Sequence, residues 1–127
     1  MNKKLNAIGK GEMDYDYEHD ILFFKVKDRE YNHSLELSGL VIDLDAEGYP
    51  TGIQIFDASK IFQIEKVALQ QIQQWKFAIQ IHDRVVAVSL FFTTLRRNKV
   101  IECRQEIERP IAQPVQNATV ECTVLSR

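Results

Sequence analysis

The sequence of 127 residues has no apolar run that approaches the ~20 residues of a membrane-spanning helix. Its first residues, MNKKLNAIGKGEM, are basic but contain no apolar segment of the kind that defines a secretory signal. These two absences predict a cytoplasmic protein that does not enter a membrane.

Positive charge is not in excess, because 18 acidic residues outnumber 16 basic ones and the net charge is −2. Domains that bind nucleic acid usually carry a basic footprint, so the overall charge argues against that class. The local exception is the predicted turn Arg96-Arg97-Asn98-Lys99, which Arg104 follows on the next predicted strand. A basic turn can contact phosphates, so an RNA- or ribosome-associated factor using Arg96, Arg97, Lys99 and Arg104 stays open as an alternative.

Familiar catalytic motifs are also missing. The five glycines do not cluster with Lys-Ser or Lys-Thr as in a phosphate-binding loop, and no Gly-x-Ser-x-Gly sequence occurs. The three histidines lie in separate regions, and His82-Asp83, the nearest approach to an acid–base pair, falls at a predicted turn. Adjacent turn residues are usually exposed and seldom converge on a pocket. We predict a protein that is not an enzyme and uses no cofactor.

Cysteine is scarce, with only Cys103 and Cys122. Thiols of cytosolic proteins are usually reduced, which favours two free cysteines. Both positions lie on predicted strands, so a cross-strand disulfide is the alternative in an oxidising setting. Two cysteines without a CxxC motif do not make a zinc site by themselves.

What the sequence does contain is ordinary for one globular domain: 45% apolar and 27% charged residues. A chain of this size can bury roughly two-thirds of its unfolded surface, enough for a core without disulfides. Residues 1–13 hold two glycines, two asparagines and three lysines, which predicts a flexible tail. The domain is then expected to span residues 14–127.

Alternating apolar residues predict strands through the first half. Ile21–Lys27 turns Leu22, Phe24 and Val26 to one side, and Leu40–Leu44 alternates in the same way. Asp45-Ala46-Glu47-Gly48 suits a type I turn, since Asp caps nearby N–H groups and Gly accepts positive φ. A second strand follows, and Asp57 or Ser59 is placed to begin a short helix.

The same turn has a second interpretation as a calcium loop. Asp43, Asp45, Glu47 and Gly48 match the first, third, fifth and sixth positions of an EF-hand. Gln54 stands at the twelfth position, where that loop needs a bidentate Glu, and the flanks are strands. The hairpin turn is therefore favoured.

The second half changes period and then returns to strands. Apolar residues at helical spacing predict one helix over Ile64–Gln73. Val85–Leu95 is a nearly continuous apolar run that looks buried on both faces, which predicts a central strand or a strand at an interface. We predict a mainly β (α+β) domain of antiparallel meanders with about eight strands and one short helix, forming a sandwich or open barrel.

Four carboxylates alternate before the first strong strand: Asp14, Asp16, Glu18 and Asp20. In an extended segment they would line one face, and such clusters can hold a magnesium or calcium ion. They equally suit a solvated edge that resists strand-to-strand aggregation, which is the favoured interpretation. A small-ligand or divalent-cation binding protein using these residues stays open as an alternative.

Several segments in the first half occur together in a known family. They are Tyr15–Phe23, Leu40–Asp45, Gly48, Gly52–Ile55 and Asp57–Ser59. In this order they resemble the family called domain of unknown function 2283, over about Asp14 to Lys60. The resemblance implies a β-rich fold and no catalytic residues, and some members are similar to the antitoxin-like halves of two-protein operons. The long second half departs from the shortest members.

Aromatic residues exceed what the predicted core faces need: Phe23, Phe56, Trp75, Phe91 and Phe92. Some of them must lie at a second interface, either inside the fold or with another protein. Aromatic side chains are enriched at the cores of protein interfaces. The leading hypothesis is a non-enzymatic protein-interaction module, antitoxin-like or otherwise, that forms a homo-oligomer or binds a protein partner.

Overall fold

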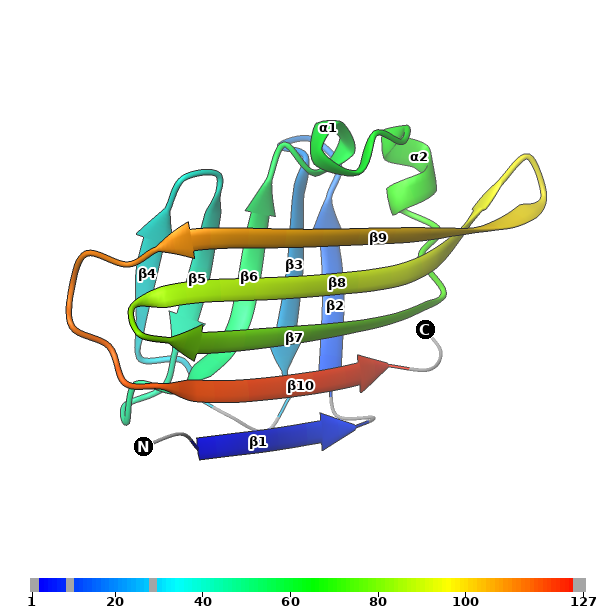
Figure 1. Cartoon of the computed structure of the whole chain (residues 1–127). Coiled ribbons are helices and arrows are strands. Elements are labelled where there is room, and N and C mark those ends of the chain that lie inside the picture. Colours follow the sequence, from blue (N-terminus) through cyan, green and yellow to red (C-terminus); the bar gives the residue numbers. More distant parts are fainter. Residues whose placement is uncertain (1–2, 9–10, 28–29, 125–127) are drawn as a thin grey trace.

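The computed structural model describes residues 3–8, 11–27 and 30–124, which form ten strands and two short helices. The strands make two five-stranded sheets that lie face to face as two layers (Figure 1). Sheet A contains, in spatial order, β1 (Lys3–Ile8), β10 (Ala118–Val124), β7 (Gln74–His82), β8 (Val85–Arg96) and β9 (Lys99–Pro110). Sheet B contains β2 (Gly11–Asp16), β3 (Ile21–Val26), β6 (Pro50–Phe56), β5 (Leu40–Leu44) and β4 (His33–Leu37).

The strands of sheet A run across those of sheet B, so the fold is a sandwich with crossed layers (Figure 1). The predicted mainly β class is confirmed, and the described strands stay in two separate sheets rather than one closed barrel. Neighbouring strands are antiparallel except for β1, which lies parallel to β10. Residues 1–13, predicted as a tail, instead contain β1 and the first half of β2. Pairing with the far end of the chain leaves no local signal in the sequence.

The core lies between the two sheets, and aromatic rings from both layers meet in it. Leu22, Phe24 and Val26 of β3 are buried, as the alternation predicted. The ring of Phe24 lies 4.3 Å from that of Trp75 and 5.9 Å from that of Phe77, both on β7. These contacts join sheet B to sheet A through close-packed apolar side chains.

The hairpin between β5 and β6 has the predicted turn. The N–H of Gly48 donates to the carbonyl of Asp45 at 3.0 Å, and Gly48 has φ of 87°. The Asp45 carboxylate accepts from the N–H groups of Glu47 and Tyr49, both at 2.9 Å. Asp45 therefore fixes the turn by capping it, as expected of Asp at this position.

The single predicted helix over Ile64–Gln73 is wrong in its bounds. The structure has α1 (Ala58–Phe62) and α2 (Lys66–Leu69), separated by Gln63 with φ of 57°. The hydroxyl of Thr94 on β8 donates to the carbonyl of Ala68 near the end of α2. The same carbonyl accepts from the N–H of Gln71 at 3.0 Å, so this terminal carbonyl has two partners outside the helix.

Strand β8 is a central strand of sheet A, as predicted, but over most of its length it is buried on one face only rather than on both. Val86, Val88, Leu90 and Phe92 are buried, whereas the alternate residues Val85 and Ser89 are exposed. Sheet B covers the inner face of sheet A, and the outer face of β8 carries the remaining apolar residues of the run. An outward Phe91 on this face is half-buried.

Candidate functional site

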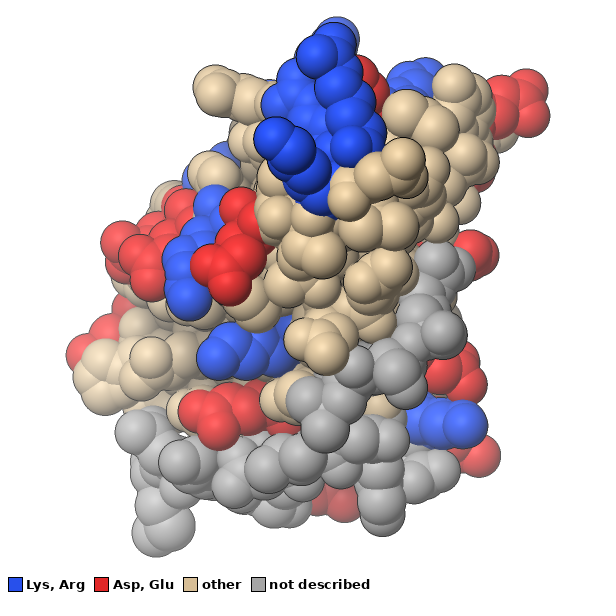
Figure 2. Space-filling model, turned by 90° about the vertical axis from the view of Figure 1, so that its right-hand side faces the viewer, with Lys and Arg blue, Asp and Glu red and all other residues tan. Residues whose placement is uncertain are grey.

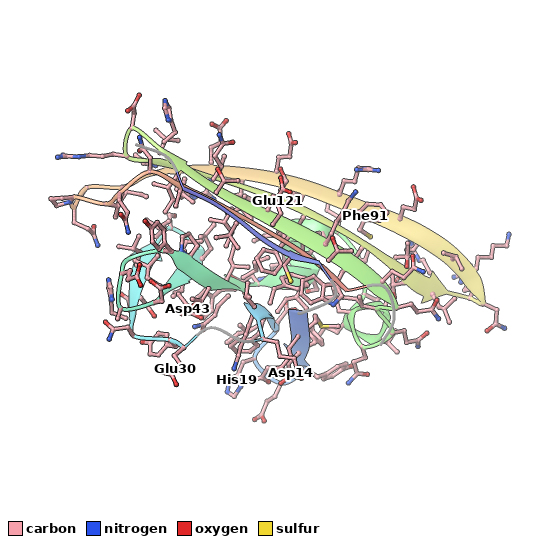
Figure 3. The ribbon with its side chains drawn as sticks, turned by 90° about the horizontal axis from the view of Figure 1, so that it is seen from below. Asp14, His19, Glu30, Asp43, Phe91 and Glu121 are labelled. Atoms are coloured by element: carbon pink, nitrogen blue, oxygen red, sulfur yellow. The ribbon has the colours of Figure 1, made fainter. Side chains whose placement is uncertain are left out.

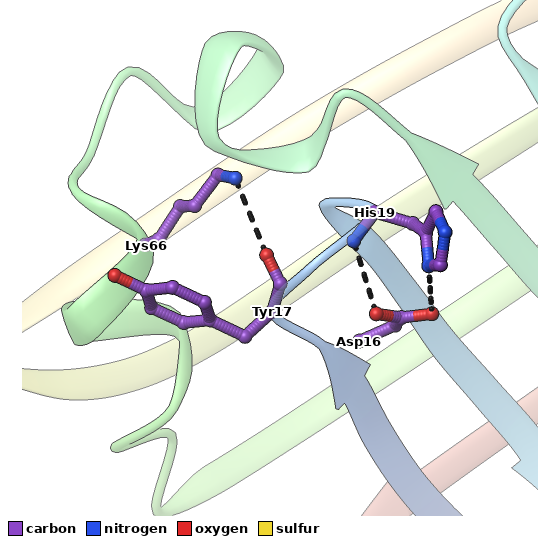
Figure 4. A network of polar contacts seen from close by, with 4 residues as sticks. All are labelled: Asp16, Tyr17, His19 and Lys66. Carbon is purple, nitrogen blue, oxygen red and sulfur yellow. Dashed lines mark hydrogen bonds and ion pairs between the residues drawn. The ribbon is translucent and has the colours of Figure 1, made fainter.

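The four acidic residues that the sequence singled out do not come together. Asp14 and Glu18 are exposed, whereas Asp20 is buried. Asp16 instead accepts from the His19 N–H at 3.0 Å and contacts the His19 ring at 2.9 Å (Figure 4). Over the described part of the chain, no three His, Cys, Asp or Glu side chains are grouped to hold a metal ion. Asp43, the first position of the calcium-loop interpretation, instead accepts a hydrogen bond from the Ser34 hydroxyl at 2.9 Å.

Asp20 has a different role, as a buried carboxylate that begins helix α1. It accepts from the Ser59 N–H at 3.0 Å, from the Ser59 hydroxyl at 2.6 Å and from the Tyr15 hydroxyl at 2.6 Å. Burial alone would raise the pKa of Asp20, but these hydrogen bonds outweigh it and lower the pKa. Burial, and then the bond to Asp20, raises the pKa of Tyr15. The group is a fixed anion and serves as a structural cap.

Lys66 of α2 contacts the start of the turn between β2 and β3, the turn that ends at Asp20. Its ammonium donates to the carbonyl of Tyr17 at 3.2 Å and lies 5.4 Å from the centre of the Tyr17 ring (Figure 4). The β2–β3 turn is thus held by both helices. Two of the segments that suggested the family meet at this place: Tyr15–Phe23 and Asp57–Ser59. Their contacts with each other show that these sequence motifs have a structural role.

The predicted basic turn is a two-residue hairpin loop between β8 and β9. Arg97 and Asn98 have φ of 53° and 64°, and Arg96 pairs with Lys99 at the ends of the strands. Arg96, Arg97 and Lys99 are exposed, and Figure 2 shows Lys and Arg side chains gathered at this end. Arg96 contacts Glu65 at 2.8 Å. Arg104 does not belong to this turn, since it lies further along β9 opposite Phe91.

The outer face of sheet A holds a cavity of about 780 Å³ that the sequence did not reveal. Strands β7, β8, β9 and β10 all contribute to its lining. Phe91 lies there with the Arg104 guanidinium 4.5 Å and the Lys76 ammonium 5.4 Å from its ring centre. Figure 3 shows Phe91 and Glu121 on this side of the molecule, away from Asp14 and His19.

Sequence reasoning found part of this site. Phe91 was among the surplus aromatics and Arg104 among the basic candidates, but Trp75 and Phe92 prove to be core residues. Lys76, Glu106 and Glu121 were missed, although the alternation of β7, β9 and β10 already placed them on outward faces. Alternation within one strand does not give the register between strands, and that register is what brings these three residues into one site.

The remaining candidates lie outside the cavity or carry no reactive character. His82 and Asp83 are exposed neighbours whose side chains approach to 3.2 Å at the β7–β8 turn. Cys103 and Cys122 are free thiols. Burial raises the pKa of Cys122 to about 11 and also raises the pKa of Cys103, so both stay protonated at neutral pH.

Two proteins are similar in sequence to about 70% of this chain. No solved structure matches it, and no helix in the described ranges is long and apolar enough to cross a membrane. An uncharacterized protein of Methanocaldococcus jannaschii is 31% identical over 93 residues, 72% of this chain and 80% of that protein. A Methanosarcina mazei protein named "Putative hypoxanthine phosphoribosyltransferase" is 28% identical over 89 residues, 70% of this chain and 72% of that protein.

The family comparison agrees with the segments that first suggested a relationship. The model of the family described as protein of unknown function (DUF2283) matches residues 12–59. This span covers almost the whole of sheet B and the start of α1. The chain therefore belongs to the DUF2283 family.

Proposed function

We propose that this protein is a non-enzymatic protein-interaction module that binds through the outer face of sheet A. The observation that carries the proposal is Phe91, an outward aromatic ring flanked by two cations beside a cavity. Aromatic and Arg side chains are enriched among the residues that dominate binding energy at protein interfaces. The cavity offers a partner a place to insert a side chain.

The name of the Methanosarcina mazei relative suggests a transferase that handles a phosphorylated sugar. Phosphate groups are often bound at helix N-termini. In this chain the N-terminus of α1 already receives the Asp20 carboxylate, and α2 has only four residues. This arrangement supports the non-enzymatic role. The free thiols fit a cytoplasmic location, because reducing compartments keep cysteines unpaired.

The test is a pull-down of tagged protein from its host, with and without nuclease, read by mass spectrometry. Wild type is compared with Phe91→Ser and with Tyr31→Ser, a control that removes an exposed aromatic ring elsewhere. We expect a nuclease-resistant protein that wild type and Tyr31→Ser retain and Phe91→Ser loses. Capture that is indifferent to Phe91→Ser would contradict the proposal.

A second candidate is RNA binding through the β8–β9 turn, favoured by the exposed Arg96, Arg97 and Lys99 at one end of the molecule. It predicts an RNA affinity that falls steeply with salt and is lost in Arg97→Ala with Lys99→Ala. Asn98→Gly serves as the uncharged control, because glycine accepts the positive φ of this position. Material that nuclease removes in the pull-down would favour this candidate over the first.

A further inference from the structure

The register of sheet A arranges its outward side chains in rows across the strands, and two neighbouring rows in the middle of the face contrast in character. The first row, which we call the aromatic row, holds Lys76 on β7, Phe91 on β8 and Arg104 on β9. The next, which we call the hollow row, holds Glu121, Ala78, Ser89 and Glu106 on β10, β7, β8 and β9. Two residues along a strand separate the rows by about 7 Å.

We propose that this face binds a second copy of the chain, with the aromatic row of each copy lying over the hollow row of the other. This inference rests on the proposed interaction role and names the partner. A two-fold axis parallel to the rows and midway between them produces the arrangement. Every contact then occurs twice, as in any isologous dimer.

Shape supports this pairing. Ala78 and Ser89 are small side chains, and they line the cavity beside Phe91. Under the two-fold axis, Phe91 is carried over Ser89 of the second copy, with Ala78 beside it on the next strand. Each copy thus offers one projecting ring and one hollow to receive it, which is the anchor-and-pocket form of an interface hot spot.

Charge supports the same pairing. The axis places Arg104 over Glu106 of the second copy and brings Lys76 toward Glu121 of the second copy. All four side chains are exposed in the single chain. If the aromatic row of one copy lay over the aromatic row of the other, cations would meet cations. The distribution of charge therefore favours the arrangement in which each aromatic row lies over a hollow row. A nucleic acid on this face would meet Glu106 and Glu121, whose charge repels phosphates.

One contact opposes the dimer. The axis also brings Glu102, which precedes the aromatic row on β9, toward Glu108 of the second copy, which follows the hollow row. Both carboxylates are exposed, and like charges placed together weaken association. A dimer of moderate affinity is therefore expected, and Glu108→Gln should tighten it.

A charge swap tests the proposal. Lys76→Glu with Arg104→Glu leaves only acidic charges in the two rows, and Glu106→Lys with Glu121→Lys leaves only basic charges in them. We expect wild type to dimerise by sedimentation equilibrium, each variant alone to remain a monomer, and an equimolar mixture to form a heterodimer. Circular dichroism checks that both variants fold. A monomeric wild type, or a mixture that stays monomeric, would overturn the arrangement.

A neutral variant separates shape from charge. Ser89→Tyr fills the hollow without changing any charge, and we expect it to remain folded and monomeric. If wild type is a monomer while Phe91→Ser still loses a captured protein, self-association is wrong and the interaction role stands. If Phe91→Ser changes neither capture nor oligomeric state, both are wrong.

Discussion

At the scale of single residues, the side chain on which most local structure depends is Asp20. Its carboxylate joins the β2–β3 turn to Ser59, 39 residues away, and to the Tyr15 hydroxyl. We expect Asp20→Asn to lower the free energy of unfolding by about 2–3 kcal/mol, since hydrogen bonds to a charged group are lost. Denaturant titration measures this, and the exposed Glu18→Gln is the control with little expected change.

The lowered pKa of Asp20 gives this contribution a pH dependence. An acid with a depressed folded pKa stabilises the protein above its ordinary pKa, and the stabilisation is lost as pH falls through the folded pKa. Wild type should lose this part of its stability below about pH 4. Unfolding measured against pH should show a shallower acid loss for Asp20→Asn, and parallel curves would refute the assignment.

Gly52 is required by the close approach of two backbones. A Cβ at this position would lie 2.7 Å from the carbonyl oxygen of Phe24 on the neighbouring strand. Backbone cannot move aside cheaply, so Gly52→Ala should cost about 1–3 kcal/mol. Gly39→Ala is a poor control because its φ is positive, but Ser38→Ala, exposed in the β4–β5 turn, should be nearly neutral in thermal unfolding.

At the scale of elements, the β8–β9 turn is held in a conformation that its sequence does not favour. Both Arg97 and Asn98 have positive φ, and Asn-Gly is the pair best suited to such a two-residue hairpin. We expect Asn98→Gly to raise stability by up to about 1 kcal/mol, because glycine removes the steric cost of positive φ and its greater entropy in the unfolded chain offsets only part of that gain. The same replacement at Ser89, in the middle of β8, should be destabilising, and calorimetry of both variants distinguishes the two cases.

The elements also show how far sequence reasoning reached. Alternation identified the strands and inward residues such as Leu22 and Ile53 because a half-buried strand has a period of two. The helices were predicted less well: α1 begins after Asp57 as expected, but the carboxylate that caps it is Asp20 of the β2–β3 turn, and α2 is much shorter than Ile64–Gln73. Alternation also did not reveal the hollow row, because Glu121 lies beside Ala78 only when β10 pairs with β7, and these strands are far apart in the sequence.

At the scale of the whole molecule, sheet A has one face in the core and one face that carries Phe91 outward. If that face binds a second copy, stability depends on concentration by mass action. We expect the melting temperature of wild type to rise with protein concentration and that of Phe91→Ser to stay constant. Calorimetric scans over a dilution series check this, and equal behaviour of the two proteins would contradict it.

The division of the chain between the sheets has a consequence for how the protein is made. All strands of sheet B lie between Gly11 and Phe56, whereas sheet A joins β1 to β10, the first and last described strands. During synthesis, sheet B can therefore assemble early, but β1 must wait for the end of the chain. The apolar side of the nascent sheet B stays uncovered until β7 and β8 emerge. That interval is when this chain is most exposed to aggregation and most dependent on chaperones.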